Sequence, residues 1–393
     1  MNDKARINAG LVLDNLDLSG AEKIAVNLLR HAGRMQSINL QGFICMDDRL
    51  GCTKVAENLM HLTPDMPNFG SLLFRLKKAL IATVRLRRSA KSFDVLIAVT
   101  PPAVIFAFLA TIFMPCQIIP WVHYDLDGIS RSRLTKGRGL RDSLQQILYM
   151  NFVPAFRIII FVSENTRASF SRHKGSTRPA WYVLPNTLDE SSFLPATESE
   201  TSIKATILAN AGVPLLLFLG RIFPQKRWQD AIAVAEYLAA KGWKFNMAFV
   251  GDGIEREAFI ERTRASPAAS HLHYLGSDTN PLPTVKCAAA LIITSLYEAW
   301  PTVILEANLA DIPVLSYDCP SGPREMLGKN ERGIVTKESP EALADGIIYY
   351  FSLDKTLRTL MLVRAHDFAT SFLPKTTLSQ WEATLTKIVQ DGR

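Results

Sequence analysis

SLYEAWPTVILEANLADIPVLSYDCPSGPRE, residues 295–325, follows the apolar run Ala288–Ile293 and carries two glutamates eight residues apart, Glu298 and Glu306. The apolar run predicts a buried strand, the residues around Glu298 a short loop, and the second apolar sequence a helix. Two helical turns contain about 7.2 residues, so a residue just before a helix and one eight positions later can face the same side. The stretch therefore predicts one cleft that holds both carboxylates.

Glu306 lies within VILEANLA, an otherwise apolar helical sequence. A carboxylate in such a helix is costly unless it has a partner, and the hydroxyl groups of a neutral polyol would provide one. The alternative is structural, because paired glutamates around a strand-to-helix turn are often solvated caps. The sequence context favours a binding role, while the spacing alone leaves both interpretations open.

The chain of 393 residues is long enough for two domains of about 180 residues, and its composition is that of an ordinary globular protein. No segment reaches the ~20 apolar residues of a membrane span, and the N-terminus lacks the apolar region of a secretory signal. The five cysteines are scattered, with neither a zinc-ligand spacing nor a disulfide framework. We expect a cytoplasmic protein.

The charge is unevenly distributed along the chain. Residues 1–195 contain 24 Lys and Arg against 15 Asp and Glu, whereas residues 196–393 contain 20 against 22. The basic half predicts an anionic partner, which can be membrane lipid, a phosphorylated acceptor or nucleic acid.

The most basic segment, Phe69–Lys91, alternates leucines with arginines and lysines and predicts a helix. One interpretation is that the helix packs its apolar stripe into its own core and leaves its charges in water. The other is an interfacial helix on anionic lipid, where each basic residue contributes roughly 1 kcal/mol. The sequence does not decide between them.

Strands alternate with helices along the chain, which predicts parallel doubly wound sheets whose ligands gather beyond the carboxyl ends of the strands. Pro185-Asn186 marks the passage between two domains, and the polar segment Ala196–Lys204 suits a loose surface loop. The expected strands are Arg6–Leu13, Leu40–Cys45, Asp94–Val99, Gln117–Val122, Arg157–Val162, one from Leu215 to Gly220, Phe245–Val250, Leu272–Leu275 and the apolar run before residue 295. The expected helices include Pro102–Phe113, Leu140–Val153, Asp230–Ala240 and Thr376–Val389.

Several polar residues and glycines stand at predicted strand or helix ends. Ser19 and Glu22 form a capping-box pattern, and Gly20 would let a ligand approach the helix start. Arg221 and Lys226, after the glycine that ends a strand, can clamp a diphosphate, and two surface salt bridges are the alternative.

Five motifs in this order resemble the retaining glycosyltransferases of family four, which have the GT-B fold of two doubly wound Rossmann-like domains facing a cleft. The motifs are Ser19-Gly20-Ala21-Glu22, Pro185-Asn186, Gly220-Arg221 with Lys226, Gly251-Asp252-Gly253, and the stretch 295–325. The resemblance implies an acceptor-binding domain over residues 1–185, a nucleotide-sugar-binding domain over 186–372, and a helix in 373–393 that returns to the first domain.

The resemblance also implies roles for single residues. Glu306 would bind the ribose and Glu298 the transferred sugar, while Gly276–Asn280 would line the nucleobase pocket. The implied catalytic residues are His123, Arg221, Lys226 and Glu298. The implied donor-binding residues are Gly20, Gly220, Gly251, Trp300, Pro301, Thr302, Val303 and Glu306. The chain departs from the family at Ala299, Trp300 and Asp311, where glycine, phenylalanine and glycine are usual.

The predicted function is transfer of a hexose or N-acetylhexosamine from a nucleotide-sugar, with UDP as the expected nucleotide, to a glycan or lipid-linked acceptor of bacterial polysaccharide or lipopolysaccharide assembly. The basic loop with Arg131, Arg133, Lys136 and Arg138 would bind a phosphorylated acceptor. No cofactor, nucleic acid or metal is expected. Asp125-Leu126-Asp127 matches the metal-binding DxD of another glycosyltransferase fold but stands among repeated parallel units. The alternatives are a UDP-N-acetylhexosamine epimerase of the same fold and a non-catalytic protein docked on a membrane.

Overall fold

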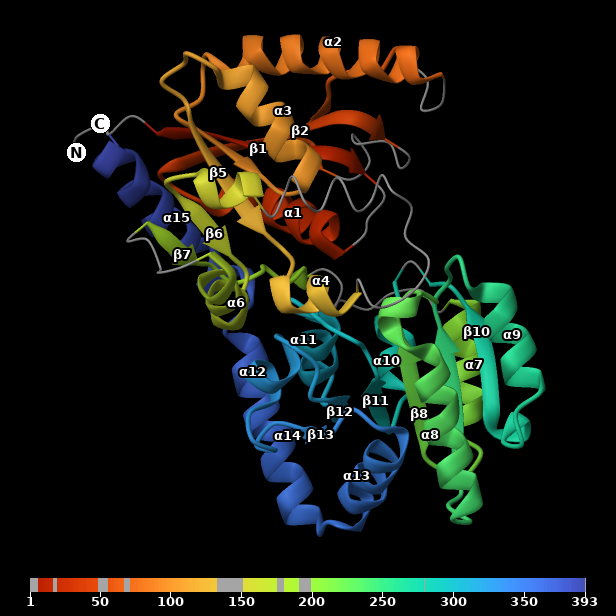
Figure 1. Cartoon of the computed structure of the whole chain (residues 1–393). Helices are drawn as coiled ribbons and strands as arrows, with labels where there is room; N and C mark the ends of the chain where they lie inside the picture. Colours follow the sequence, from red (N-terminus) through yellow and green to blue (C-terminus); the bar gives the residue numbers. More distant parts are fainter. Residues whose placement is uncertain are drawn as a thin grey trace. The chain divides into compact units, whose positions relative to one another are not determined.

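A computed structural model describes residues 6–16, 20–48, 56–66, 71–132, 151–174, 180–190, 199–278 and 280–392. The chain forms two compact units (Figure 1). Unit 1 comprises Met1–Leu126, Gly137–Leu188 and Leu373–Arg393, and unit 2 comprises Asp127–Lys136 and Asp189–Phe372. Each unit contains one sheet in which all paired strands are parallel.

Unit 1 has a seven-stranded sheet in the order β3-β2-β1-β4-β5-β6-β7. The central strands are almost continuously apolar, since helices cover both faces of a parallel sheet. The strands are β1 (Ile7–Leu16), β2 (Ile38–Asp48), β3 (Leu59–His61), β4 (Val95–Ala98), β5 (Gln117–Val122), β6 (Ile159–Phe161) and β7 (Trp181–Val183). The helices of this unit that precede its last segment are α1 (Gly20–His31), α2 (Leu72–Ala90), α3 (Pro101–Thr111) and α6 (Glu164–Lys174), whereas α4 (Leu126–Ser132) belongs to unit 2 from Asp127 on.

The last helix, α15 (Pro374–Gly392), packs on unit 1 against α1 and β2. The indole of Trp381 is fully buried with its ring centroid 4.6 Å from that of Trp121, and its Nε1 donates to the carbonyl of Pro185 at 3.2 Å. Ser37 Oγ donates to a carboxylate oxygen of Glu382 at 2.7 Å. The end of the chain therefore completes the core of the unit that the beginning of the chain forms.

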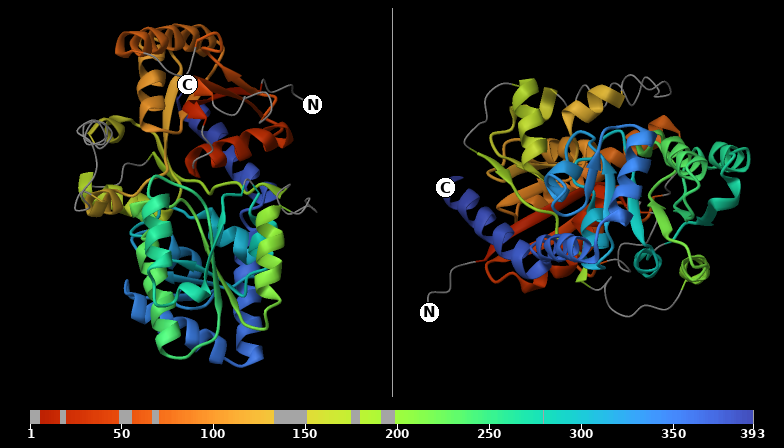
Figure 2. Two further views of the ribbon diagram at one scale, coloured as in Figure 1. Left: turned by 90° about the vertical axis from the view of Figure 1, so that its right-hand side faces the viewer. Right: turned by 90° about the horizontal axis from the view of Figure 1, so that it is seen from below.

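Unit 2 has a six-stranded sheet in the order β10-β9-β8-β11-β12-β13. The strands are β8 (Leu215–Leu219), β9 (Asn246–Val250), β10 (Leu272–Gly276), β11 (Ala290–Ile293), β12 (Val314–Tyr317) and β13 (Ile334–Thr336). Helices lie on both sides of this sheet (Figure 2). They are α7 (Glu200–Ala209), α8 (Trp228–Ala240), α9 (Arg256–Arg264), α10 (Leu282–Lys286), α11 (Thr302–Leu309), α12 (Pro323–Leu327), α13 (Pro340–Ser352) and α14 (Lys355–Thr370).

The two doubly wound parallel sheets confirm the predicted fold class, and most predicted elements are present within a few residues. Two expectations were wrong, since α7 replaces most of the loop expected up to Lys204 and α4 occupies the start of the loop expected after Asp127. The strands β3, β7, β12 and β13 were not predicted. The predicted helix Leu140–Val153 and the cap Ser19 fall largely or wholly outside the described residues. Within the described ranges, no helix combines the length and the apolar character needed to cross a membrane.

Candidate active site

The strand order of unit 2 reverses between β8 and β11, because the chain leaves β8 toward β9 on one side and later returns to form β11 on the other. Ligands of doubly wound sheets bind at such a switch point, outside the carboxyl ends of the two strands. The loops that follow β8 and β11 carry Arg221, Lys226 and Glu298. The topology therefore brings these predicted residues to the edge of the sheet where a ligand is expected.

The two loops are joined by hydrogen bonds and by one ion pair. Leu296 N donates to the carbonyl of Gln225 at 2.8 Å, and the side chain of Gln225 donates to the carbonyl of Tyr297 at 3.1 Å. Lys226 Nζ lies 2.5 Å from Glu298 Oε1, which also accepts from Ser295 Oγ at 2.7 Å. Only 20% of the lysine side chain and 9% of the glutamate side chain are exposed. A cation and a carboxylate from different loops are thus held together in a largely buried position.

A third loop, after β12, supports Glu298 from the other side. Glu298 N donates to the carbonyl of Pro320 at 3.2 Å. Gly322 has a φ of 53°, and a Cβ there would lie 2.6 Å from Pro301 Cδ and 3.3 Å from Glu298 Cβ. Only glycine fits this position. Gly322 belongs to the stretch 295–325, but its structural role depends on a contact between distant loops that no local sequence pattern records.

Gly251 packs the loop after β9 against the loop after β8. Its φ is 143°, and a Cβ would lie 1.9 Å from the carbonyl oxygen of Gly220. The strands continue pairing here, since Gly220 N donates to the carbonyl of Val250 at 3.0 Å and Ile222 N to that of Asp252 at 2.9 Å. Packing within the protein therefore explains why a glycine stands at position 251, where it allows the loop after β8 to lie close.

The segment Trp300–Val303 leads into α11, whose N-cap Pro301 provides no side-chain cap. The first N–H groups of a helix have no acceptor four residues back, and together with the helix dipole they favour an anion. Ile304 N donates to the carbonyl of Pro301, so Thr302 and Val303 are the donors at the start of this helix. Glu306 lies one turn further along α11 and is half-buried.

Trp300 is buried, with its ring 5.4 Å from that of Phe372, and its indole Nε1 has no hydrogen-bond partner among the described residues. Arg221 is exposed, and its guanidinium carbon lies 5.0 Å above the ring of Phe223. Lys226 therefore belongs to a largely buried ion pair and Arg221 to a cation–π contact, so with the residues that the structure describes neither forms the surface salt bridge that was the alternative expectation.

His123 follows β5 of unit 1, where its ring lies 4.3 Å from that of Trp121. Burial lowers the pKa of His123 from 6.5 to about 3, so the imidazole is neutral near pH 7. Its Nε2 is buried and has no hydrogen-bond partner in the described part of the chain. A neutral imidazole with an unused ring nitrogen can form a hydrogen bond to a hydroxyl group but cannot supply positive charge.

Gly20 is the first residue of α1, and a Cβ built there meets nothing within 4 Å. Packing within the protein therefore does not require glycine at this position, in contrast to Gly251. Glu22 is buried in the first turn of α1, and its predicted partner Ser19 falls outside the described residues.

The predicted acceptor residues lie largely beyond the described ranges. Arg131 belongs to the last turn of α4, while Arg133, Lys136 and Arg138 fall outside. Asp125 is fully buried just before α4, and Asp127 lies in its first turn rather than in a loop. Among the described residues no group of three or more His, Cys, Asp or Glu is placed to hold a metal ion. For the predicted nucleobase segment, Asp278 accepts a hydrogen bond from Ser199 Oγ at 2.7 Å.

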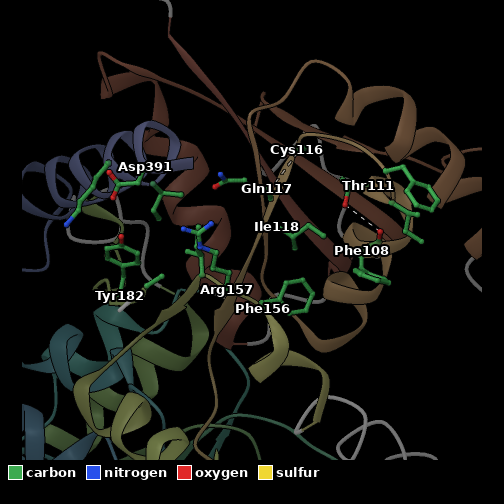
Figure 3. A pocket seen from close by; sticks show the side chains of 15 residues that line it. Phe108, Thr111, Cys116, Gln117, Ile118, Phe156, Arg157, Tyr182 and Asp391 are labelled. Carbon is green, nitrogen blue, oxygen red and sulfur yellow. Dashed lines mark hydrogen bonds between the residues drawn. The ribbon is translucent and has the colours of Figure 1, made fainter. Parts of the chain in front are cut away.

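A cavity of about 940 Å³ lies in unit 1 at the amino ends of β5, β6 and β7, which is the side of the sheet opposite to the carboxyl ends of the strands (Figure 3). Gln117 is the first residue of β5, and Arg157 and Ala180 stand just before β6 and β7. Phe108 and Phe156 form much of the apolar wall. Because the chemistry of doubly wound sheets lies beyond the carboxyl ends of the strands, we place the active site at the β8–β11 switch point and not in this cavity.

Comparison with known proteins shows the family and the fold of the chain. The family model Glycosyltransferase Family 4 matches residues 18–192, and the model Glycosyl transferases group 1 matches residues 199–361. An exopolysaccharide phosphotransferase of Streptomyces coelicolor is 26% identical over 60% of this chain and 24% of its own length. The lipopolysaccharide 1,6-galactosyltransferase of Salmonella typhimurium is 31% identical over 29% of this chain and 32% of its own length.

The chain spans only part of its curated relatives, with matches that cover 24% to 46% of the proteins from Streptomyces, Methanocaldococcus, Niallia and Erwinia. Among solved structures, Anabaena HepE in complex with UDP and glucose has a TM-score of 0.77 over 97% of this chain and all of its own, at 17% identity. The two family models together cover most of the chain, and the shared architecture covers nearly all of it. The chain therefore belongs to the family-four glycosyltransferases and has their GT-B fold.

Proposed function

We propose that this protein is a retaining glycosyltransferase that moves a hexose or an N-acetylhexosamine from a UDP-sugar to a glycan or lipid-linked acceptor in bacterial polysaccharide or lipopolysaccharide assembly. The observation that carries the proposal is the Lys226–Glu298 pair at the switch point. UDP and glucose are bound in the Anabaena structure, and the Streptomyces and Salmonella relatives are named for exopolysaccharide and lipopolysaccharide. These names support the UDP donor and the polysaccharide acceptor.

In this proposal the ion pair between Lys226 and Glu298 separates when the donor binds. Glu298 turns its carboxylate to hydroxyl groups of the sugar, and Lys226 turns toward the diphosphate, whose negative charge grows as the bond to the sugar breaks. Arg221 leaves Phe223 to reach the same diphosphate, and the N–H groups of Thr302 and Val303 face it from the start of α11. These donors stabilise the transition state more than the bound donor, which is the requirement for catalysis.

Retention follows from substitution on one face of the sugar. The bond between the anomeric carbon and the phosphate oxygen breaks while the acceptor oxygen forms its bond to that carbon, and the acceptor proton passes to the departing phosphate oxygen. His123 binds a donor hydroxyl through its neutral ring. The cationic side chains neutralise the diphosphate, so the proposed reaction needs no metal and should continue in the presence of a chelator.

The proposed location is the cytoplasm, with attachment to the inner face of the membrane that carries a lipid-linked acceptor. The reason for this location is that a lipid-linked acceptor would lie in that membrane.

Mixing the protein with UDP-glucose, UDP-galactose, UDP-N-acetylhexosamines and GDP-mannose tests the proposal. Release of UDP with transfer to an acceptor supports it, whereas an epimeric nucleotide-sugar without release would identify an epimerase. Glu306→Ala should weaken UDP binding more than tenfold in a calorimetric titration, since the carboxylate would lose its bonds to the ribose. The matched control is Glu257→Ala, an exposed glutamate of α9. Unchanged UDP affinity in Glu306→Ala would remove the ribose role.

A further inference from the structure

Helix α2 turns its leucines toward solvent. Leu72, Leu76, Leu80 and Val84 recur every four residues and are 74%, 58%, 66% and 43% exposed, and Leu73 beside them is 79% exposed. Residues four apart lie above one another on a helix, so these side chains form one apolar stripe along its length. We call these five residues the α2 stripe. Figure 1 shows α2 along the outer edge of unit 1.

The inner side of α2 is held by contacts that fix its rotation. Its buried residues are Lys78, Ala82, Leu86 and Ala90. Lys78 Nζ lies 3.0 Å from Asp47 Oδ1, and its side chain is only 2% exposed. The guanidinium of Arg87 donates to the carbonyls of Ala110 at 3.0 Å and Ile112 at 2.9 Å. A helix selected only for solubility would bury its apolar side chains, whereas α2 buries Lys78 and leaves four leucines and Val84 exposed.

The charge of α2 suits an anionic surface. Leu72–Ala90 contains six Lys and Arg residues and no Asp or Glu. Arg75, Lys77 and Arg88 are exposed beside the stripe. An apolar face with basic residues beside it is the pattern of helices that lie in the interface of an anionic bilayer, where leucines enter the acyl region and basic side chains reach the head groups.

A second exposed apolar group follows at the end of α3, which packs against α2. Ile105, Phe108 and Leu109 of α3 are partly exposed, and Phe113 is fully exposed with a φ of 62°. A bulky residue rarely adopts this left-handed backbone conformation. The conformation leaves a large aromatic side chain in water next to the segment that Arg87 holds.

We propose that the α2 stripe docks the protein on an anionic lipid bilayer, with Arg75, Lys77 and Arg88 in contact with the head groups and Phe113 as a further contact. The docking surface deepens the proposed function, because it brings the enzyme to the membrane of a lipid-linked acceptor. Only this purpose of the docking rests on the proposed function. Binding to lipid does not itself require transferase activity.

Cosedimentation with vesicles tests the docking surface. The full-length protein should bind vesicles of phosphatidylcholine with phosphatidylglycerol at 0.15 M salt and bind pure phosphatidylcholine at least tenfold more weakly. The variant Leu73→Gln/Leu76→Gln/Leu80→Gln should lose at least tenfold in partition coefficient. Arg75→Glu/Lys77→Glu/Arg88→Glu should lose a similar amount on anionic vesicles alone. The matched control is Ile203→Gln/Ile207→Gln/Ile254→Gln, which removes three exposed isoleucines of unit 2 and should bind as the wild type does.

Three results would overturn the inference. The first is wild-type protein that does not sediment with anionic vesicles, and the second is a leucine variant that sediments as well as wild type. The third is a concentration-dependent dimer in sedimentation velocity that the leucine variant abolishes, because the stripe would then join two copies of the chain. UDP binding by the leucine variant separates the two proposals, since intact UDP binding with lost vesicle binding leaves the transferase function in place.

Discussion

The carboxyl edges of the two sheets are built in different ways. In unit 2, the loops after β8, β11 and β12 are tied to one another, and Lys226 and Glu298 already form an ion pair of 2.5 Å. In unit 1, the described part of the edge presents His123, whose Nε2 has no partner there, and Gly20, beside which there is open space. The comparison teaches that unit 2 has its polar groups assembled before a ligand arrives, whereas those of unit 1 are left available for one.

Replacement of Lys226 tests the assembled edge and should have the largest effect. Lys226→Ala should lower kcat/KM by about 10³-fold or more, equivalent to about 4 kcal/mol, since the diphosphate loses its cation. It should also lower the free energy of unfolding by about 2 kcal/mol, because Glu298 stays buried with one hydrogen bond fewer. Initial rates of UDP release and urea denaturation measure the two effects.

The control for this variant is Lys241→Ala, which removes an exposed lysine paired with Asp345 in the same unit. Exposed pairs contribute only about 0–1 kcal/mol, so both measurements should stay close to wild type. A Lys226→Ala enzyme with a normal rate would show that the ion pair is only structural.

Two glycines sharpen the comparison, one from each edge. Gly251→Ala should lower the free energy of unfolding by about 3 kcal/mol, because its Cβ would meet the Gly220 carbonyl at 1.9 Å and its φ of 143° disfavours a side chain. Gly20→Ala should leave stability unchanged, since nothing lies within 4 Å, and yet slow transfer at least tenfold where a ligand occupies that space. Thermal melts and transfer rates separate the two outcomes. A fully active Gly20→Ala enzyme would contradict a ligand role for this position.

The third prediction concerns the pH dependence of stability. The unfolded chain binds a proton on His123 near pH 6.5 and the folded protein near pH 3, so stability rises with pH between these values and is lost as the pH falls from 6.5. The contribution of His123 should lower the free energy of unfolding, measured by urea denaturation, by about 1 kcal/mol between pH 7 and pH 5.5. His123→Gln should show a smaller loss over the same interval. Equal slopes in the two proteins would mean that His123 is not buried in its neutral form.

Features that depend on local sequence could be predicted. β5 was predicted with its observed bounds, Gln117–Val122, because it is a short apolar run between two predicted helices. The positions of Glu298 before a helix and of Lys226 after a strand followed from the same alternation. Each property belongs to neighbouring residues, so one sequence suffices to find it.

Features that depend on contacts between distant residues could not be predicted. β3 has one buried residue among its three, so it lacks the continuous apolar run that predicted the equally short β6. The rotation of α2 about its axis is fixed by the contact of Lys78 with Asp47, which is 31 positions away. The sequence of the helix alone therefore does not show which of its faces is buried. Gly322 meets Glu298 and Pro301 only in the folded chain, and the pairing of Lys226 with Glu298 spans 72 positions.

The return of α15 to unit 1 has a consequence for how the protein is made. Residues 189–372 form an insertion within unit 1, so a ribosome completes unit 2 before it has supplied Trp381, which packs against Trp121. The half translated first must wait for residues 373–393 to close its core. A premature stop after residue 372 would therefore spare the later half and damage the earlier one.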